Sequence, residues 1–220
     1  MNKKIFIITP ASRIRNLKKI KKSIDFKKIT KWIIVYDLNS IKKKIKIFKQ
    51  NKNIIELFYL DKSSVGGNSQ RNFALKYLNK KKNKNFFIYY LDDDNIIHKN
   101  FYKLIDKIES KKIYTFDQLR RGKMYINGKF KYVKILKGNI VKQGLIDSGM
   151  FLPYFSLVNK IRWPRKVYAS DGPYIIKCYL KNKKLHKYIP IVCSHYNYFK
   201  RNILESYKKE IKEKIYSFLR

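Results

Sequence analysis

Three consecutive carboxylates, Asp92, Asp93 and Asp94, directly follow the apolar run "FFIYYL" (86–91). The chain has only 15 Asp and Glu against 53 Lys and Arg, so this concentration of acid needs a chemical reason. Adjacent carboxylates raise one another's pKa unless a cation relieves them. Mg²⁺ and Mn²⁺ bind carboxylate oxygens and usually leave positions for substrate phosphates. The triplet therefore predicts a divalent-metal site, with Asp92 and Asp94 pointing the same way and Asp93 elsewhere, or a solvated turn that caps the next helix.

Apolar runs typical of β-strands alternate with basic helical patterns through the first half of the chain. Continuous apolar strands separated by helices indicate an α/β fold whose parallel sheet is buried on both faces. Ligands of such sheets bind beyond the carboxyl ends of the strands, where Asp37, Asp61 and the triplet all stand. Most acid of the first hundred residues is therefore expected on one rim. Strands are predicted at 4–9, 32–37, 54–60, 86–91 and 112–116, and helices at about 14–24, 40–50, 69–80 and 98–109.

The alternation ends at "KMYINGKFKYVKI" (123–135), where Asn127 and Gly128 predict the tight turn of a β-hairpin. "SDGPYIIKCYL" (170–180) predicts a helix, because Ser or Asp precedes an apolar run. Apolar residues at every fourth position of 203–215 predict an amphipathic C-terminal helix that docks onto the core or faces a membrane. We expect one compact domain with a soft boundary near residue 117.

The composition narrows the class of protein. Hydrophobic residues at 45% and aromatics at 15% indicate a folded chain. The formal charge of +38 favours binding to polyanions such as nucleic acid or an anionic membrane. A simpler explanation is an AT-rich genome, whose codons favour Lys, because the lysines are spread along the whole chain. Cys178 and Cys193 lack C-x-x-C spacing, which indicates a reducing, cytoplasmic location. "KKIFIITP" is too short for a signal peptide, and no run of about 18 apolar residues predicts a membrane span.

Several segments, taken in order and spacing, resemble the GT-A glycosyltransferases, most closely the inverting β-1,3-glucuronyltransferases and their small bacterial relatives. The resemblance implies a mostly parallel central sheet flanked by helices, with a small hairpin insertion and a C-terminal helix. It divides the domain into a nucleotide-sugar-binding half (1–116), an acceptor-side half (117–197) and the amphipathic helix (198–220). The segments are "WIIVYD" (32–37), "GGNSQRNFALKYL" (66–78), "FIYYLDDDN" (87–95), "IDSGMFL" (146–152), "YASDGPYI" (168–175) and the His of "VCSHYN" (192–197).

The resemblance also assigns the donor site. It implies that Asp94 ligates Mn²⁺ or Mg²⁺, with Asp92 and Asp93 near the ribose or the metal, and that Asp37 lies by the nucleotide base. Helix N-terminal amides and an arginine suit a diphosphate. Without the resemblance Arg71 would be one solvated base among many, and His195 a core histidine. The remaining donor contacts that it implies are Pro10, Arg13, Gln70, Arg71, Asn72 and His195.

Inverting transfer needs a carboxylate that takes the proton of the acceptor hydroxyl. Asp171 is the candidate, where the glucuronyltransferases use Glu; it is equally placed to begin a helix. Asp147 is the second choice, as a residue that orients donor or acceptor or as a buried structural carboxylate. Trp163 and Tyr168 could stack on a sugar or pack in the core.

The predicted function is metal-dependent inverting transfer of a sugar from a UDP-linked donor to a hydroxyl of a glycan or lipid-linked acceptor, in cell-surface polysaccharide synthesis. A sugar-phosphate nucleotidyltransferase shares the acidic rim, but "TPASRIR" (9–15) lacks the glycine-rich loop expected of it. A nucleic-acid-binding protein would leave three clustered acids unexplained, so nucleic acid is not an expected partner. The basic surface and C-terminal helix predict peripheral attachment to the inner face of a membrane.

Overall fold

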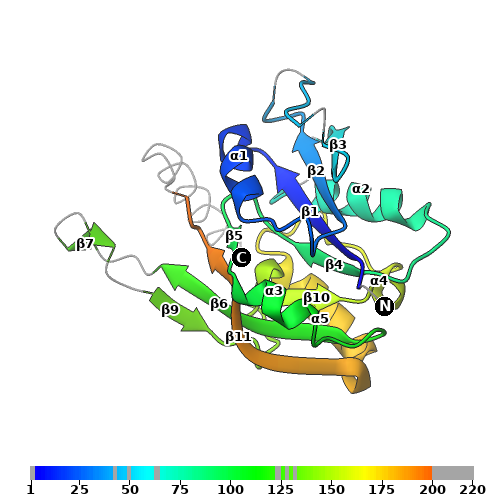
Figure 1. Cartoon of the computed structure of the whole chain (residues 1–220), viewed down its shortest axis with the longest axis vertical. Helices are drawn as coiled ribbons and strands as arrows, with labels where there is room; N and C mark the ends of the chain where they lie inside the picture. Colours follow the sequence, from blue (N-terminus) through cyan, green and yellow to red (C-terminus); the bar gives the residue numbers. More distant parts are fainter. Residues whose placement is uncertain are drawn as a thin grey trace.

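A computed structural model describes residues 3–41, 44–48, 51–61, 65–121, 125–126, 129–130 and 133–199. Four parallel strands form its first sheet in the order β3-β2-β1-β4 (Figure 1). Ile7 of β1 pairs with Trp32 of β2 on one side and with Tyr89 of β4 on the other. The parallel sheet predicted from the apolar runs is confirmed. Its strands are β1 (Ile5–Ala11), β2 (Lys31–Asp37), β3 (Ile54–Tyr59) and β4 (Phe87–Tyr90).

Helices cover both faces of this sheet, because alternate side chains of each strand point to opposite faces. Ile5 and Ile7 of β1 belong to a core with Leu17 of α1, and Phe6 and Ile8 to another core on the opposite face. Each fully buried apolar side chain contributes about 1.5–3 kcal/mol to stability. The first core contains α1 (Ile14–Lys22) and α3 (Asn100–Ile105), and the second α2 (Asn68–Asn79) and α5 (Asp171–Lys181).

A second, mixed sheet has the order β10-β6-β11-β5, with β9 paired to β6. β6 and β11 run parallel, and the other pairs are antiparallel. The strand predicted at 112–116 lies here, and the soft boundary near 117 falls inside it. A bridge between Phe87 and Tyr154 joins the two sheets. The strands are β5 (Ile96–Ile97), β6 (Ile113–Arg121), β9 (Val133–Leu136), β10 (Phe151–Pro153) and β11 (His186–Tyr196).

The remaining elements are short. The predicted hairpin is confirmed by β7 (Tyr125–Ile126) and β8 (Lys129–Phe130), which pair antiparallel and lie away from the body of the chain (Figure 1). The segment 170–180 forms α5 as predicted. Of the C-terminal helix predicted at 198–220, only 198 and 199 belong to the described residues and these two are not helical, so the remainder stays a prediction. One-turn helices occupy Ser148–Met150 (η1), Phe155–Val158 (α4) and Lys183–Leu185 (η2).

The helix predicted at 40–50 was wrong for the part of that segment which the structure describes. The buried carboxylate of Glu56 accepts hydrogen bonds from the backbone amides of Ile47 at 2.7 Å and Phe48 at 3.0 Å, and from the Tyr36 hydroxyl at 2.6 Å. Those amides are therefore held by β3 and not by a helical turn. Ile45, which the helix would have buried, is 57% exposed.

The helix predicted at 98–109 is shorter than expected. It covers only Asn100–Ile105. β5 precedes it, and beyond its end the amide of Glu109 donates a hydrogen bond to the Tyr114 hydroxyl at 2.7 Å and not to a helical carbonyl. Across the described part of the chain, no helix is long and apolar enough to cross a bilayer.

Candidate active site

A cavity of about 740 Å³ opens at the carboxyl ends of β1 and β4. Here the chain leads from β1 outward to β2 and β3 and then returns past β1 to β4, and such a reversal of strand order is where open α/β sheets bind ligands. Of the chain's 15 acidic residues, six line this cavity, whereas only two arginines and no lysine of the described residues do so. The expected convergence of acid is present for Asp37 and the triplet, whereas Asp61, expected on the same rim, does not line the cavity and pairs with Arg165 at 2.6 Å. The acids are Asp37, Asp92, Asp93, Asp94, Asp147 and Asp171, and the arginines are Arg13 and Arg71.

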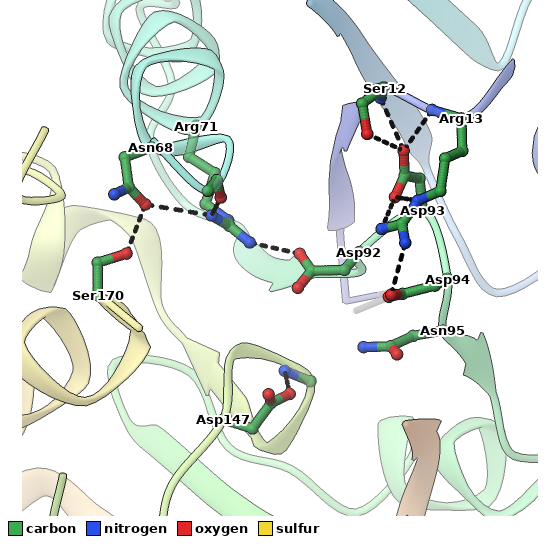
Figure 2. A network of polar contacts seen from close by, with 12 residues as sticks. Ser12, Arg13, Asn68, Arg71, Asp92, Asp93, Asp94, Asn95, Asp147 and Ser170 are labelled. Atoms are coloured by element: carbon green, nitrogen blue, oxygen red, sulfur yellow. Dashed lines mark hydrogen bonds and ion pairs between the residues drawn. The ribbon is translucent and has the colours of Figure 1, made fainter. Parts of the chain in front are cut away.

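The triplet forms a turn, in which the amide of Asn95 donates to the carbonyl of Asp92 at 3.0 Å. Asp93 points to the loop after β1, where its carboxylate accepts the amides of Ser12 and Arg13, both at 2.7 Å, and the Ser12 hydroxyl at 3.0 Å (Figure 2). The Arg13 guanidinium also pairs with Asp93, and reaches Asp94 at 2.9 Å. The carboxylate of Asp93 is thus hydrogen-bonded to the loop after β1 through both of its oxygens.

Burial disfavours the charge of Arg13, but Asp93 and Asp94 more than offset this and raise its pKa. Asp92 lies apart from them and pairs with Arg71 of α2 (Figure 2). Burial raises the pKa of Asp92 to about 6, Arg71 opposes the rise, and the nearby Asp147 and Asp94 add to it. One arginine therefore neutralises Asp92 only in part.

Asp147 and Asp171 form the other wall of the cavity. The carboxylate of Asp147 accepts from Gln118 Nε2 and from the amide of Gly149, both at 2.9 Å, and lies 3.6 Å from the Arg120 guanidinium. Asp171 stands in the first turn of α5. Its burial, together with the charges of Asp147 and Asp92, raises its pKa to about 8, although Arg71 and Arg120 oppose the shift. The pKa of Asp171 therefore lies far above that of an ordinary carboxylate.

The N-terminus of α2 also faces the cavity through Gly66, Gly67, Gln70 and Arg71, with no acid in the first turn to neutralise it. Gly67 has a φ of +76°, and a Cβ there would lie 2.7 Å from Pro10 Cβ, so only glycine fits. Backbone amides at such a terminus attract anions. A diphosphate would find both these amides and an arginine at one place.

Ten of the residues predicted for the site line the cavity, and three do not. Asn72 Nδ2 donates to the Trp163 carbonyl at 2.9 Å, so its amide is turned to the backbone. Trp163 is only 2% exposed and offers no face to a sugar, which corrects the stacking prediction. His195 lies in β11 beside His98 and Tyr198. The ten are Pro10, Arg13, Asp37, Gln70, Arg71, Asp92, Asp93, Asp94, Asp147 and Asp171, and Tyr168 joins them.

Sequence reasoning missed several residues that shape the site. Asn68 Nδ2 donates to the carbonyls of Pro164 at 2.8 Å and Val167 at 3.0 Å, and the Ser170 hydroxyl donates to its Oδ1. Asn68 lies inside "GGNSQRN", but nothing local tells which distant carbonyls it meets. The others are Ser12, Gln118, Arg120 and Tyr196, whose partners lie on other elements.

The donor atoms fit a divalent cation that binds together with a phosphate ligand. No group of three His, Cys, Asp or Glu side chains that could hold a metal occurs among the described residues. Asp92 and Asp94 nevertheless both line the cavity, and burial, with the charges of Asp147 and Asp94, raises the pKa of Asp92 in spite of Arg71. Mg²⁺ commonly takes one or two carboxylates and completes its shell with phosphate oxygens and water.

Neither a protein-family model nor a curated protein matches the sequence. Solved structures do. Staphylococcus aureus TarS in complex with UDP-GlcNAc aligns over 91% of this chain and 59% of its own, with a TM-score of 0.63 and 18% identity. The chain has the GT-A fold. The predicted fold is thereby confirmed, while the closer likeness to glucuronyltransferases stays a prediction.

Two further structures show the range of chemistry on this fold. The mannosyltransferase PcManGT from Pyrobaculum calidifontis, in complex with GDP-Man and Mn²⁺, aligns over 91% of this chain and 58% of its own, with a TM-score of 0.54 and 10% identity. A 4-diphosphocytidyl-2C-methyl-D-erythritol synthase from Anaerococcus prevotii aligns over 93% and 92%, with a TM-score of 0.51 and 14% identity. This GT-A chain spans about three-fifths of the two glycosyltransferase chains.

Proposed function

We propose that the protein is a metal-dependent glycosyltransferase that moves a sugar from a nucleotide donor, UDP-linked, to a hydroxyl of a glycan or lipid-linked acceptor with inversion. The observation that carries the proposal is the cavity in which six carboxylates meet two arginines and a helix N-terminus at the topological switch point. TarS with UDP-GlcNAc and PcManGT with GDP-Man and Mn²⁺ share the fold and support it. We place the reaction in cell-surface polysaccharide synthesis.

The donor half of the reaction belongs to the triplet and α2. Asp92 and Asp94 would hold Mn²⁺ or Mg²⁺, which neutralises the charge of the departing diphosphate. The α2 N-terminus and Arg71 receive the diphosphate, and Asp37 faces the nucleotide base. Asp93 acts indirectly, since its bonds to Ser12 and Arg13 fix the loop that forms the neighbouring wall.

The acceptor half centres on Asp171. Its carboxylate takes the hydroxyl proton while the acceptor oxygen attacks the anomeric carbon on the face opposite the diphosphate. The bond from that carbon to the diphosphate oxygen breaks with inversion, and the nucleoside diphosphate leaves with the electron pair. A base whose pKa is about 8 is well matched to such a step near neutral pH. Asp147 lies on the same wall of the cavity and is held by Gln118.

The proposal predicts that Asp94→Asn loses metal-assisted nucleotide binding. Wild-type protein should bind UDP more tightly with Mn²⁺ than without it, measured by titration calorimetry, whereas the variant should lose at least about tenfold of that gain, since a charged ligand is replaced by a neutral amide. Asp106→Asn is the matched control, because Asp106 pairs with Lys28 on the surface. An Asp94→Asn protein with the full Mn²⁺ effect would remove the metal from the proposal.

A sugar-phosphate nucleotidyltransferase remains the second candidate, favoured by the near-complete mutual coverage with the erythritol synthase. The two are separated by product. Release of UDP from a UDP-sugar on addition of an acceptor supports glycosyl transfer, whereas release of pyrophosphate from a nucleoside triphosphate and a sugar phosphate supports the alternative.

We also propose that the protein attaches to the inner face of a membrane, where lipid-linked acceptors lie. In α1, Arg15, Lys18, Lys19 and Lys22 share one exposed face that starts beside the cavity, and the helix contains no acid. By contrast α2, with 12 residues, has a single exposed base, Lys76. Anionic lipids attract such a face by about 1 kcal/mol per base.

Reversing two charges of α1 should therefore weaken attachment. Lys18→Glu with Lys22→Glu is expected to reduce binding to phosphatidylglycerol vesicles about tenfold or more in a flotation assay. Lys177→Glu with Lys181→Glu, on the exposed side of α5, makes the same change of charge elsewhere. Equal losses in both variants would show that only net charge matters, and α1 would then have no special role.

A further inference from the structure

Trp163 lies at the centre of a three-layer stack. The Arg71 guanidinium carbon is 4.4 Å from the centroid of the indole, and Tyr174 stacks on it with a centroid distance of 4.1 Å and an interplanar angle of 12°. The indole is 2% exposed and Tyr174 is fully buried. An arginine over the face of a desolvated indole is attracted by the negative electrostatic potential of that face. Trp163 is therefore the surface on which Arg71 rests.

The backbone of Trp163 is fixed to the same helix that carries Arg71. Asn72 Oδ1 accepts the Trp163 amide at 2.9 Å, and Asn72 Nδ2 donates to the Trp163 carbonyl at 2.9 Å. Both polar groups of one peptide segment are thus bound by one side chain of α2. The indole cannot slide along α2 without breaking these two bonds.

The outer layer of the stack belongs to the helix of the candidate base. Tyr174 lies three residues after Asp171 in α5, and its hydroxyl is 2.7 Å from the hydroxyl of Tyr90 in β4. Tyr90 comes two residues before Asp92. One stack therefore touches the three elements that carry Arg71, Asp92 and Asp171.

The edge of the Arg71 guanidinium is held by two hydrogen bonds and one ion pair. Its guanidinium donates to the Gly66 carbonyl at 2.7 Å and to Asn68 Oδ1 at 3.3 Å, and pairs with Asp92. Its Nε is buried without a hydrogen-bond partner among the described residues. The indole supports the face of the guanidinium, whose edge contacts direct it toward Asp92 and the cavity.

We infer that Trp163 is a positioning residue, which sets Arg71 and Asp92 on the donor side at a fixed separation from Asp171 on the acceptor side. The inference deepens the proposed function and rests on it for its kinetic consequences. The part of the inference that concerns structure, that the indole orders the Arg71 guanidinium, does not depend on the proposed function. Aromaticity at position 163 should therefore matter more than volume.

The test compares Trp163→Phe, which keeps a ring, with Trp163→Leu, which fills space without one. An ordered guanidinium gives resolved Nη resonances in ¹⁵N NMR, identified as Arg71 by their loss in Arg71→Lys. We expect these resonances in wild-type and Trp163→Phe protein and their collapse in Trp163→Leu. The Kd of UDP with Mn²⁺ should rise about tenfold in Trp163→Leu and less than threefold in Trp163→Phe. The kcat for transfer should fall in the same order.

Trp32→Leu serves as the control for a general loss of stability. Trp32 is fully buried in the other core and donates to Thr9 Oγ1 at 2.8 Å, so its loss should lower Tm without changing the Arg71 resonances or the Kd. If Trp163→Leu does not fold, Asn72→Ala serves instead, because it removes both bonds to the Trp163 backbone and leaves the core volume unchanged. It should broaden the Arg71 resonances and raise the Kd.

Two outcomes are decisive. A folded Trp163→Leu or Asn72→Ala protein with wild-type Arg71 resonances and a Kd within twofold of wild type overturns the inference. Wild-type protein that binds no nucleotide overturns the proposed function, while the NMR comparison still decides whether Trp163 orders Arg71.

Discussion

Asp171→Asn is expected to stop sugar transfer and, above pH 8, to make the folded protein more stable. Removing a general base commonly costs a factor of 10² to 10⁴ in rate, and we expect a loss of about a thousandfold. Because Asp171 is not among the residues proposed to hold the metal or the diphosphate, the affinity for UDP with Mn²⁺ should stay within about threefold of wild type. Turnover and calorimetry measure the two effects separately.

The gain in stability follows from the raised pKa of Asp171, about 8 in the folded chain against an ordinary value of 3.8. Between these values the folded state keeps a proton that the unfolded state releases, so the free energy of unfolding falls as pH rises from about 4 to about 8. Asparagine does not titrate and escapes this loss. The difference between variant and wild type should be near zero at pH 4 and about 2 kcal/mol at pH 8.5, less than the full pKa difference implies because the side chain is partly exposed.

Urea unfolding at pH 4.5, 6.5 and 8.5 measures this trend, with Asp106→Asn as a surface control. A variant less stable than wild type at every pH would mean that the Asp171 carboxylate mainly stabilises the start of α5. Unchanged turnover would reject the base, and Asp147 would then be the next residue to test.

Arg13→Met should cause the largest loss of stability. Arg13 is the cation shared by Asp93 and Asp94, which are 2% and 5% exposed. Removing one partner of a buried ion pair leaves an uncompensated charge and typically costs about 3–5 kcal/mol. We expect a loss in this range in the free energy of unfolding at pH 7. The comparable change in an exposed pair, Lys28→Met opposite Asp106, should cost less than about 1 kcal/mol.

A double variant separates lost packing from stranded charge. If the charge of Asp93 causes the loss, Arg13→Met with Asp93→Asn should be more stable than Arg13→Met alone by at least about 1 kcal/mol, a coupling expected of groups in direct contact. Additive losses would contradict this and show that the effect of Arg13→Met does not depend on the charge of Asp93. Chemical denaturation of the four proteins completes the cycle.

The parallel sheet could be predicted because its strands are continuous apolar runs, and the acidic rim because the acids follow those runs. The segment 40–50 could not, since its apolar residues resemble a helix until Glu56 takes the amides of Ile47 and Phe48. Glu56 lies in β3, outside the segment, so the local sequence pattern of 40–50 could not show that its amides bond to this carboxylate.

The positions of the site residues were predictable, but not their individual roles. Asp93 differs from Asp92 and Asp94 only by the direction that the turn gives it, so its bonds to Ser12 and Arg13 cannot be read from "DDDN". Trp163 is a similar case. Its indole suits a sugar as well as a guanidinium, and only the three-dimensional contact with Arg71 decides between them.

The amide side chains of α2 bind carbonyls 91 to 99 residues further along the chain, at Trp163, Pro164 and Val167. Contacts of such long sequence separation form late, because the entropy of closing a long loop is lost before the contacts contribute any stability. The β1–β2 and β2–β3 pairs join neighbouring segments and can form first, whereas β4 pairs with β1 across 82 residues. The cavity exists only after β4 and the second half have docked. A nucleotide that binds this cavity would therefore also act as a ligand of the last folding step, stabilising the finished chain over its half-assembled forms.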